Sequence, residues 1–488
     1  MPARRTHLAP STAQSELAEA LDALRTELEL PGGFSPEVLA EADAARPADA
    51  VPARDLRELA FVTLDPAGAR DLDQAFLIEP RTGGGWLVRY AIADVPSFVR
   101  PGGAVDAEAR RRGQSLYAAD GVIPLHPPVI GVDRASLLPG EDRAAYVWSF
   151  ELDGQGEVLR TGLERALVRS RAQLDYESAQ RAVDAGEHAG PLAELPAFGA
   201  ARLEQERIRG GASLDLPDEE IVRDEHGGYR IERRLPLPVE TWNAQLSIMT
   251  GIAAARIMLD GGVGVLRTMP PPAPDAIAAF RIRTAALGLR WPERLAYGDY
   301  LRGLDRRDPR TGPVLRAAAS LFRGAGYEVF DGTPPADPGQ AAIAAPYAHV
   351  TAPIRRLVDR WGLVASLAIA EGRSVPAWLR ESLPELPSLM QASAARASRL
   401  EQATLDRVEA ALLADRVGEV FEATVVEARG EDRLVVQLDE PAVTATCQAP
   451  AGRPMPRAGE RMPIVLEHAD IRSGSVGFRP GGGAALPS

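Results

Sequence analysis

Three aspartates lie within nine residues of one another: Asp65, Asp71 and Asp73. Apolar residues flank them on both sides and predict two strands, while a proline and a glycine between the first two aspartates predict a turn. On an extended segment Asp71 and Asp73 would point to the same face. Three converging carboxylates repel one another unless a cation lies between them, and Mg²⁺ prefers oxygen ligands of this kind. The alternative is a solvated acidic loop, which the apolar flanks disfavour.

A second chemically informative segment spans residues 346–359. Thr351 and Pro353 predict the start of a helix, with Arg355 and Arg356 in its first turn. A helix N-terminus favours an anion, and two guanidinium groups there would make a phosphate site. The alternative is a pairing of Arg355 with Asp359 one turn later.

The two segments together are the parts of a metal-dependent phosphodiesterase. Two metal ions about 3.5–4 Å apart would activate a water molecule and stabilise the leaving oxygen of an in-line displacement. Such a reaction needs no serine or cysteine nucleophile. His349 is interpreted as a positioning or packing residue rather than a base.

Composition indicates a globular protein of about three domains, with 488 residues, 45% hydrophobic residues and a single cysteine. The lone cysteine excludes a disulfide framework and a cysteine-based zinc site. No signal core and no membrane-spanning run is evident, so a soluble, cytoplasmic protein is expected. The net charge of −13 does not exclude a nucleic-acid partner, because screening removes distant charges within about 8–10 Å.

Periodicity predicts an α+β protein. Helices are expected over 11–30, from 36, and over 240–259, 274–287, 355–371 and part of 376–413, with strands over 86–95 and 146–153. Four short strands between 418 and 467 indicate a small barrel, most simply an OB fold. The first ten residues are expected to be disordered. The predicted units are residues 1–54, a small helical module or a leader packed on the main domain; 55–413, a large mixed α/β catalytic domain; 414–479, the barrel; and 480–488, a disordered tail.

With these motifs in order, the chain resembles the ribonuclease II / ribonuclease R family, whose catalytic part is the RNB domain. The resemblance covers residues 55–413. The acidic signature of the family, an Asp followed six residues on by Asp-x-Asp-Asp, matches Asp65, Asp71 and Asp73. Further family-like segments are residues 93–95, 106–117, 122–124, 136–142 and 347–356.

The resemblance implies a 3′→5′ exoribonuclease that digests single-stranded RNA processively to nucleoside 5′-monophosphates with Mg²⁺, or with Mn²⁺. It implies that the three aspartates bind metal or shape its surroundings, with Gln74 as a further oxygen ligand. Arg355 would hold the scissile phosphate and Tyr117 would contact the 3′-terminal nucleotide. The remaining substrate contacts that the resemblance implies are Arg356, Tyr347, Thr351 and Glu401.

The chain departs from the family pattern in several places. Gln74 replaces the fourth acid, and its amide oxygen could ligate a cation but brings no charge. Ala91 stands where the family has a histidine, and residues 242–244 lack paired glutamates, with only Glu240 nearby. The segment before residue 55 is too short for the two cold-shock barrels of the family, so a more open RNA path is expected.

These departures leave a second hypothesis, a catalytically impaired RNA-binding or regulatory protein on the same fold. A DNA nuclease is a third. In each case a monomer without membrane association is expected.

Overall fold

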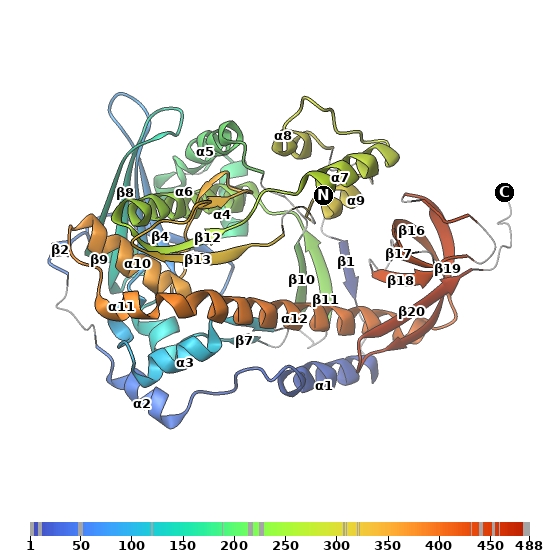
Figure 1. The fold of residues 1–488 in the computed structure, drawn as a ribbon. Helices are drawn as coiled ribbons and strands as arrows, with labels where there is room; N and C mark the ends of the chain where they lie inside the picture. Colours follow the sequence, from blue (N-terminus) through green and yellow to red (C-terminus); the bar gives the residue numbers. More distant parts are fainter. Residues whose placement is uncertain are drawn as a thin grey trace.

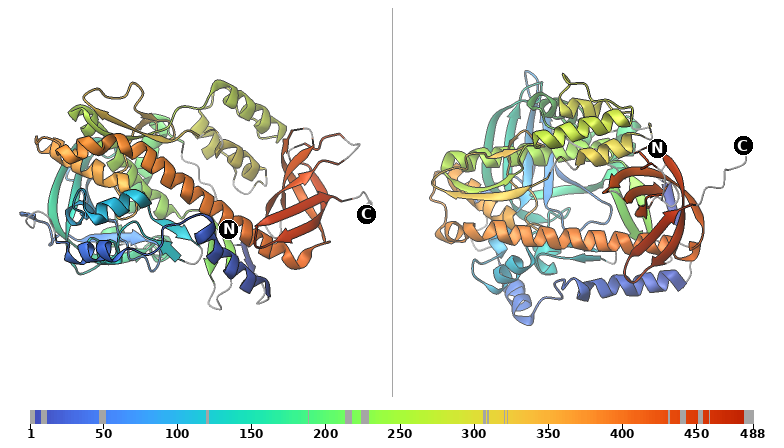
Figure 2. Two further views of the ribbon diagram at one scale, coloured as in Figure 1. Left: turned by 60° about the horizontal axis from the view of Figure 1, so that its bottom comes forward. Right: turned by 45° about the vertical axis from the view of Figure 1, so that its right-hand side comes forward.

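The structure is a computed structural model with the expected α+β architecture. A curled sheet covered by helices forms the larger body, and the long helix α12 (Leu386–Leu413) leads from it to a small barrel (Figures 1 and 2). The described residues are 4–481, apart from residues 8–11, 47–51, 119–120, 188, 213–217, 224–228, 306–307, 309, 320, 322, 431, 439–442, 451–453 and 458. Most of the predicted tail, residues 482–488, lies outside them.

The central sheet has the strand order β2-β9-β3-β4-β5-β8. Strand β9 pairs with β3 along one part of its length and with β8 along another, so the sheet curls back on itself. The strands are β2 (Arg54–Asp55), β3 (Phe61–Asp65), β4 (Gln74–Pro80), β5 (Trp86–Ala93), β8 (Asp142–Leu152) and β9 (Val158–Asp175).

Alternate residues of β4 and β5 face two different cores, as the period of two in a strand requires. Phe76 and Tyr90 belong to one core, which α6 and α10 complete. Ala75 and Ala91 belong to the other, which α2 and α3 complete. The helices around the sheet are α2 (Pro36–Ala44), α3 (Ala104–Arg112), α4 (Tyr176–Asp184), α5 (Leu195–Arg209), α6 (Pro238–Gly261), α10 (Leu357–Ala370) and α11 (Ala377–Ser382).

The N-terminal segment packs on the rest of the molecule. Helix α1 (Thr12–Glu27) lies along α12, where Leu17 and Leu24 share a core with Leu400 (Figure 2). Helix α2 packs on α3. One expectation was wrong: Arg4–His7 form strand β1, which pairs with β11 (Tyr229–Arg234) and through it with β10 (Asp218–Arg223). Cross-strand partners more than 200 residues away have no local sequence signal.

Three helices between the sheet and the barrel have a core of their own around Trp291 and Phe280. This helical unit contacts the barrel, where the Arg283 guanidinium donates to the Val426 carbonyl oxygen (2.8 Å) and to Glu427 (3.2 Å). Its helices and the neighbouring strands are α7 (Pro274–Ala286), α8 (Tyr297–Arg302), α9 (Thr311–Ala319), β12 (Val263–Thr268), β13 (Gly326–Asp331), β14 (Gly339–Gln340) and β15 (Ala345–Pro346).

The C-terminal strands form a closed barrel in the order β16-β17-β18-β20-β19. The four predicted strands are present, and β20 is a fifth strand that was not predicted from the sequence. It brings Phe478 edge-to-face against Phe421 in the barrel interior, so neither ring is free to stack on a base. The strands are β16 (Val420–Arg429), β17 (Arg433–Leu438), β18 (Thr444–Gln448), β19 (Arg461–Asp470) and β20 (Ser475–Pro480).

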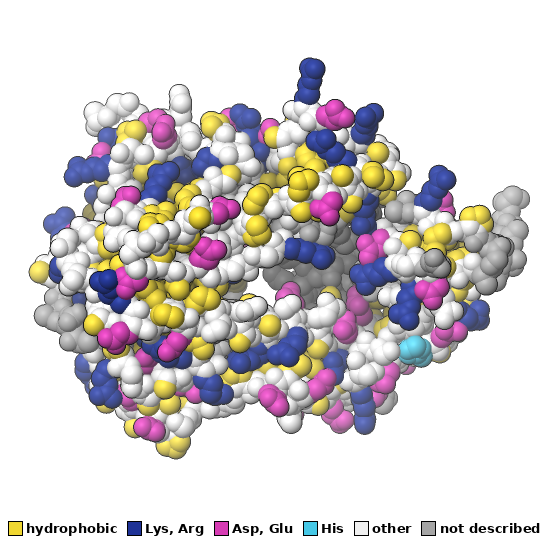
Figure 3. Space-filling view, viewed as in Figure 1, with side chains coloured by type: hydrophobic (Ala, Val, Ile, Leu, Met, Phe, Trp, Pro, Cys, Tyr) yellow, Lys and Arg dark blue, Asp and Glu magenta, His cyan; other side chains and the backbone are white. Residues whose placement is uncertain are grey.

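One face of the molecule is hollowed between the α7–α9 unit, α12 and the barrel, with both arginine and acidic side chains on its border (Figure 3). Within the described ranges, no helix has the length and apolar character needed to cross a membrane.

Candidate active site

The three aspartates lie at one end of strands β3 and β4. Asp65 is the last residue of β3, and Asp71 and Asp73 lie in the connection that leads into β4. Leu72 between them is fully buried in the core, so the two acids point away from it. Asp73 is only 3% exposed, whereas Asp71 is half-buried.

Ser136 holds the acidic connection in place. Its hydroxyl donates to the Arg70 carbonyl oxygen (2.6 Å) and accepts from the Leu72 N–H (3.0 Å). The next residue repeats the contact, since the Leu137 N–H donates to the Leu72 carbonyl oxygen (3.0 Å). The family-like segment at residues 136–142 therefore has a structural role, because it fixes the backbone from which Asp71 and Asp73 project.

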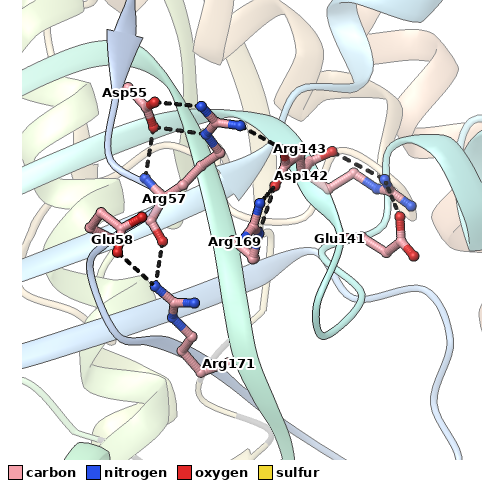
Figure 4. A network of polar contacts seen from close by, with 8 residues as sticks. All are labelled: Asp55, Arg57, Glu58, Glu141, Asp142, Arg143, Arg169 and Arg171. Carbon is pink, nitrogen blue, oxygen red and sulfur yellow. Dashed lines mark hydrogen bonds and ion pairs between the residues drawn. The ribbon is translucent and has the colours of Figure 1, made fainter.

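An ion-pair network supports Ser136 from the edge of the sheet (Figure 4). Arg143 donates from Nε to the Ser136 carbonyl oxygen (3.0 Å), and Arg57 donates to Asp142 (2.8 Å). Its members come from β2, β8, β9 and the intervening loops, which are thereby tied together. The residues drawn are Asp55, Arg57, Glu58, Glu141, Asp142, Arg143, Arg169 and Arg171.

The carboxylates of Asp65 and Asp73 would be stabilised by a cation. One oxygen of Asp65 and one of Asp73, Oδ2 in each, is buried without a hydrogen-bond partner. Burial and then repulsion from Asp71 raise the pKa of Asp65 to about 7, although Arg355 acts in the opposite direction. Burial likewise raises the pKa of Asp73 well above its ordinary value. A positive charge in this pocket would relieve both costs.

Arg355 supplies part of that charge. Its Nε lies 3.5 Å from Asp73 Oδ2, and its side chain is 45% exposed, so it faces both the acids and solvent. The other oxygen of Asp73, Oδ1, accepts the Ile354 N–H (2.8 Å). The two segments singled out in the sequence therefore meet in space.

The predicted helix start was wrong. Helix α10 begins at Leu357, and Arg356 before it is extended, with φ −130° and ψ 126°. The Leu357 N–H donates to the Gly113 carbonyl oxygen (3.0 Å) and so does not face the acids. Arg355 and Arg356 therefore precede the first turn of α10.

Arg356, rather than Arg355, pairs with Asp359. Its Nε and Nη2 each lie 2.8 Å from one carboxylate oxygen of Asp359, a two-point contact. Asp359 also accepts the Ala352 N–H (2.7 Å). Arg356 therefore braces the loop 351–356, and Arg355 is the arginine presented to the pocket.

Tyr117 lies beside the acids on the hairpin of β6 (Leu116–Ala118) and β7 (Gly121–Ile123). The buried face of the hairpin packs on α12 through Leu116, and Tyr117 on the other face is 58% exposed. Burial raises the pKa of the Tyr117 phenol, while the charge of Arg355 lowers it and the charges of Asp71 and Asp73 raise it. An exposed ring at this place is suited to stack on a base.

The hairpin is coupled to the arginine loop through the backbone. The Ser115 N–H donates to the Arg355 carbonyl oxygen (2.9 Å). Gly113, just before it, has φ +74°, and a Cβ there would lie 2.5 Å from Cβ of Ser393 on α12. A side chain at this position would strain the backbone and collide with the helix.

We expect Gly113→Ala to lower the free energy of unfolding by about 2 kcal/mol, from the strained φ plus the clash. Urea unfolding followed by circular dichroism would measure the loss. Gly372→Ala is the matched control, because Gly372 has φ +66° but open space around its missing Cβ. Equal losses in the two variants would contradict the proposed contact with α12.

The remaining predicted substrate residues lie in different surroundings. Tyr347 is buried against Gly251 of α6, and Thr351 is buried beneath Arg356. Glu401 is exposed on α12, next to Leu400, which packs against the hairpin. Tyr347 and Thr351 are therefore expected to shape the loop rather than to touch a ligand.

The structure also brings polar residues to the pocket that were not predicted from the sequence. The Tyr90 hydroxyl donates to Gln74 Oε1 (3.0 Å) and contacts the Ser247 hydroxyl (2.9 Å). Burial raises the pKa of Tyr176 to about 12, with the charge of Asp65 adding to the shift. Strand register and helix packing bring these residues to the pocket, and neither can be read from local spacing. His349, as expected, is a packing residue, with Nδ1 2.7 Å from the hydroxyl of Tyr327.

The carboxylate oxygens of the pocket suit a hard divalent ion, although the side chains do not already surround a metal position. Among the residues that the structure describes, no group of three or more His, Cys, Asp or Glu side chains is arranged to hold a metal. The two unpartnered oxygens of Asp65 and Asp73 are nevertheless donors of the type that Mg²⁺ and Mn²⁺ select. In the present arrangement Arg355 provides the countercharge.

Comparison with known families identifies the larger body. Residues 53–361 match the RNB domain. The chain belongs to the RNB-domain family. Residues 419–481 match the RNase II-type exonuclease C-terminal S1 domain, which corresponds to the closed barrel of this RNB-domain protein.

Individual relatives agree with this family assignment. The chain is 30% identical over 435 residues to ribonuclease R of Escherichia coli K12, covering 84% of this chain and 52% of that protein. The RNB-domain protein thus spans about half the length of this curated relative.

Two solved structures share the fold. RNase R of Mycoplasma genitalium in complex with ribose-methylated single-stranded RNA has a TM-score of 0.85 at 18% identity, covering 95% of this chain and 78% of the other. The yeast pseudonuclease Ssd1 has a TM-score of 0.69 at 16% identity, covering 92% and 58%. The fold alone therefore does not distinguish a nuclease from a pseudonuclease.

Proposed function

We propose that the chain is a metal-dependent 3′→5′ exoribonuclease that degrades single-stranded RNA processively to nucleoside 5′-monophosphates. One observation carries the proposal: Arg355 Nε lies 3.5 Å from Asp73 Oδ2, and the Oδ2 atoms of Asp65 and Asp73 are buried without hydrogen-bond partners. This geometry supports a role for Arg355 in binding phosphate next to acids suited to Mg²⁺ or Mn²⁺. The direction of attack and the RNA substrate rest on the family and on the relatives named above.

Each residue has a proposed task. Asp65, Asp71 and Asp73 would hold the metal, whose chemistry is activation of water and, with a pair of ions, stabilisation of the leaving oxygen. Arg355 would bind the scissile phosphate and hold it over the acids. Tyr117 would stack on the terminal base and set the position of the last phosphodiester bond.

The test uses 5′-labelled single-stranded RNA incubated with the full chain and Mg²⁺ or Mn²⁺. We expect nucleoside 5′-monophosphates to accumulate, with a short labelled end product and few intermediates. A DNA strand of the same sequence should persist, because choice of RNA relies on the 2′-hydroxyl. The absence of mononucleotides at high enzyme concentration with either metal would refute the proposal.

The second candidate is an RNA-binding protein without nuclease activity. Gln74 favours it, since this residue stands where the family signature has an acid and its amide is already engaged by Thr351 and Tyr90. Tight RNA binding without product under both metals would support this candidate.

A further inference from the structure

Gln74 uses both ends of its amide in hydrogen bonds. Its Nε2 donates to the Thr351 carbonyl oxygen (2.6 Å), and its Oε1 accepts from the Tyr90 hydroxyl (3.0 Å). These contacts fix the orientation of the amide, because a reversed amide would place Oε1 against the Thr351 carbonyl oxygen and set two acceptors face to face.

The contacts of Gln74 continue into the core. Tyr90 is fully buried on β5, and its hydroxyl contacts that of Ser247 on α6 (2.9 Å). A polar chain from Thr351 through Gln74 and Tyr90 to Ser247 therefore joins four elements: the loop before α10, strands β4 and β5, and helix α6. A buried chain of this kind gains rigidity because each member is held by its neighbours.

Gln74 and its neighbour Asp73 hold the same loop at two points. The Gln74 amide donates to the Thr351 carbonyl oxygen, and Asp73 Oδ1 accepts from the Ile354 N–H (2.8 Å). Arg355 is the next residue, and its guanidinium is the one that faces Asp73. The position of this guanidinium thus depends on a loop whose first residue is anchored by Gln74.

We propose that Gln74 is a positioning residue, which holds the Arg355 loop over the acidic pocket and does not ligate the metal ion. The inference rests on the proposed function and deepens it, because it assigns metal binding to the aspartates and phosphate binding to a loop held by Gln74. The amide is the suitable group here: a carboxylate would turn an oxygen toward the Thr351 carbonyl oxygen, whereas the amide N–H satisfies it.

The experiment compares Gln74→Met, Arg355→Ala and the double variant of the full chain. Mn²⁺ affinity is measured by calorimetry without RNA, and affinity for a single-stranded oligoribonucleotide is measured by fluorescence anisotropy without metal. Gln402→Met is the control, because Gln402 is exposed on α12 and bonds only to Asp406 among its described contacts.

We expect Gln74→Met to leave Mn²⁺ affinity within about twofold of the wild type and to weaken RNA binding about threefold to tenfold, the effect of one lost hydrogen bond. The double variant should bind RNA no more weakly than Arg355→Ala alone, because Gln74 acts through Arg355. A tenfold loss of Mn²⁺ affinity in Gln74→Met, or additive losses of RNA affinity, would overturn the proposal.

Two features keep the result interpretable. Tyr90→Phe removes only the hydroxyl that orients the amide, so it should produce a smaller loss of RNA affinity with unchanged Mn²⁺ affinity even where Gln74→Met proves unstable. An unchanged RNA affinity in both variants would overturn the proposal. Neither readout requires cleavage, so a wild-type protein without nuclease activity would refute the proposed function while the role of Gln74 is judged separately.

Discussion

Asp73→Asn should reduce RNA turnover on the order of 10³-fold, the upper range for removing one group that stabilises charge in a transition state. The asparagine retains an oxygen for the Ile354 N–H, so the Arg355 loop should keep its place. What is lost is the negative charge at Oδ2, the oxygen that faces Arg355 and has no hydrogen-bond partner. RNA affinity should therefore stay within about threefold of the wild type, since the arginine is retained.

Turnover is measured from the loss of full-length 5′-labelled RNA, and affinity from anisotropy with metal omitted. Asp22→Asn, an exposed aspartate on α1, makes the same chemical change far from the pocket and should leave both quantities unaltered. Full turnover in Asp73→Asn would remove the acidic pocket from the proposed mechanism.

Asp106→Ala should lower the free energy of unfolding by about 3–5 kcal/mol, because it leaves the buried charge of Arg360 without this partner. Asp106 forms an ion pair with Arg360, and the two side chains are 1% and 2% exposed. Arg360 lies over the ring of Trp361, 4.4 Å from its centroid. Urea unfolding would measure the loss, and a change below about 1 kcal/mol would contradict the buried pairing.

An exposed ion pair is the control for this variant. Asp331 pairs with Arg380 at the surface, so Asp331→Ala should cost less than about 1 kcal/mol.

The buried pair of Asp106 and Arg360 also predicts that stability depends on pH. Burial alone would raise the pKa of Asp106, but the charge of Arg360, the hydrogen bonds from Arg360 and the Gly102 N–H, and the charge of Arg110 together outweigh it, and the pKa lies below the ordinary value of 3.8. Because the folded pKa is the lower one, the contribution is present above about pH 4 and is lost as the pH falls further.

Local patterns were sufficient for some of the elements. The apolar periodicity around Trp86 and the long apolar run after Glu240 correspond to β5 and α6, and the short strands after residue 418 correspond to the barrel. The alternation of faces along a strand and the apolar face of a helix depend on neighbours in sequence, so spacing is informative there. Strand β1 was missed because it is short and its partner β11 lies far away in the sequence. Strand β20 was missed even though it forms a hairpin with β19.

The start of α10 shows where local rules fail. Thr351 and Pro353 are good helix-start residues, but the carboxylates of Asp73 and Asp359 capture backbone N–H groups of this segment and hold it as a turn. Tertiary hydrogen bonds thus override the capping preference, and the helix begins at Leu357. In this arrangement Arg356, and not Arg355, pairs with Asp359.

The sequence by itself determined the chemistry available to this protein: three acids of the type that bind divalent ions, arginines suited to phosphate, and the motif order of the RNB family. Only the tertiary structure decided which arginine meets the acids and which carboxylate oxygens remain without hydrogen-bond partners. The contact between Asp73 and Ile354 joins residues 281 positions apart. No spacing rule reaches that far, because such a contact exists only once the sheet, the loop and the helix have packed together.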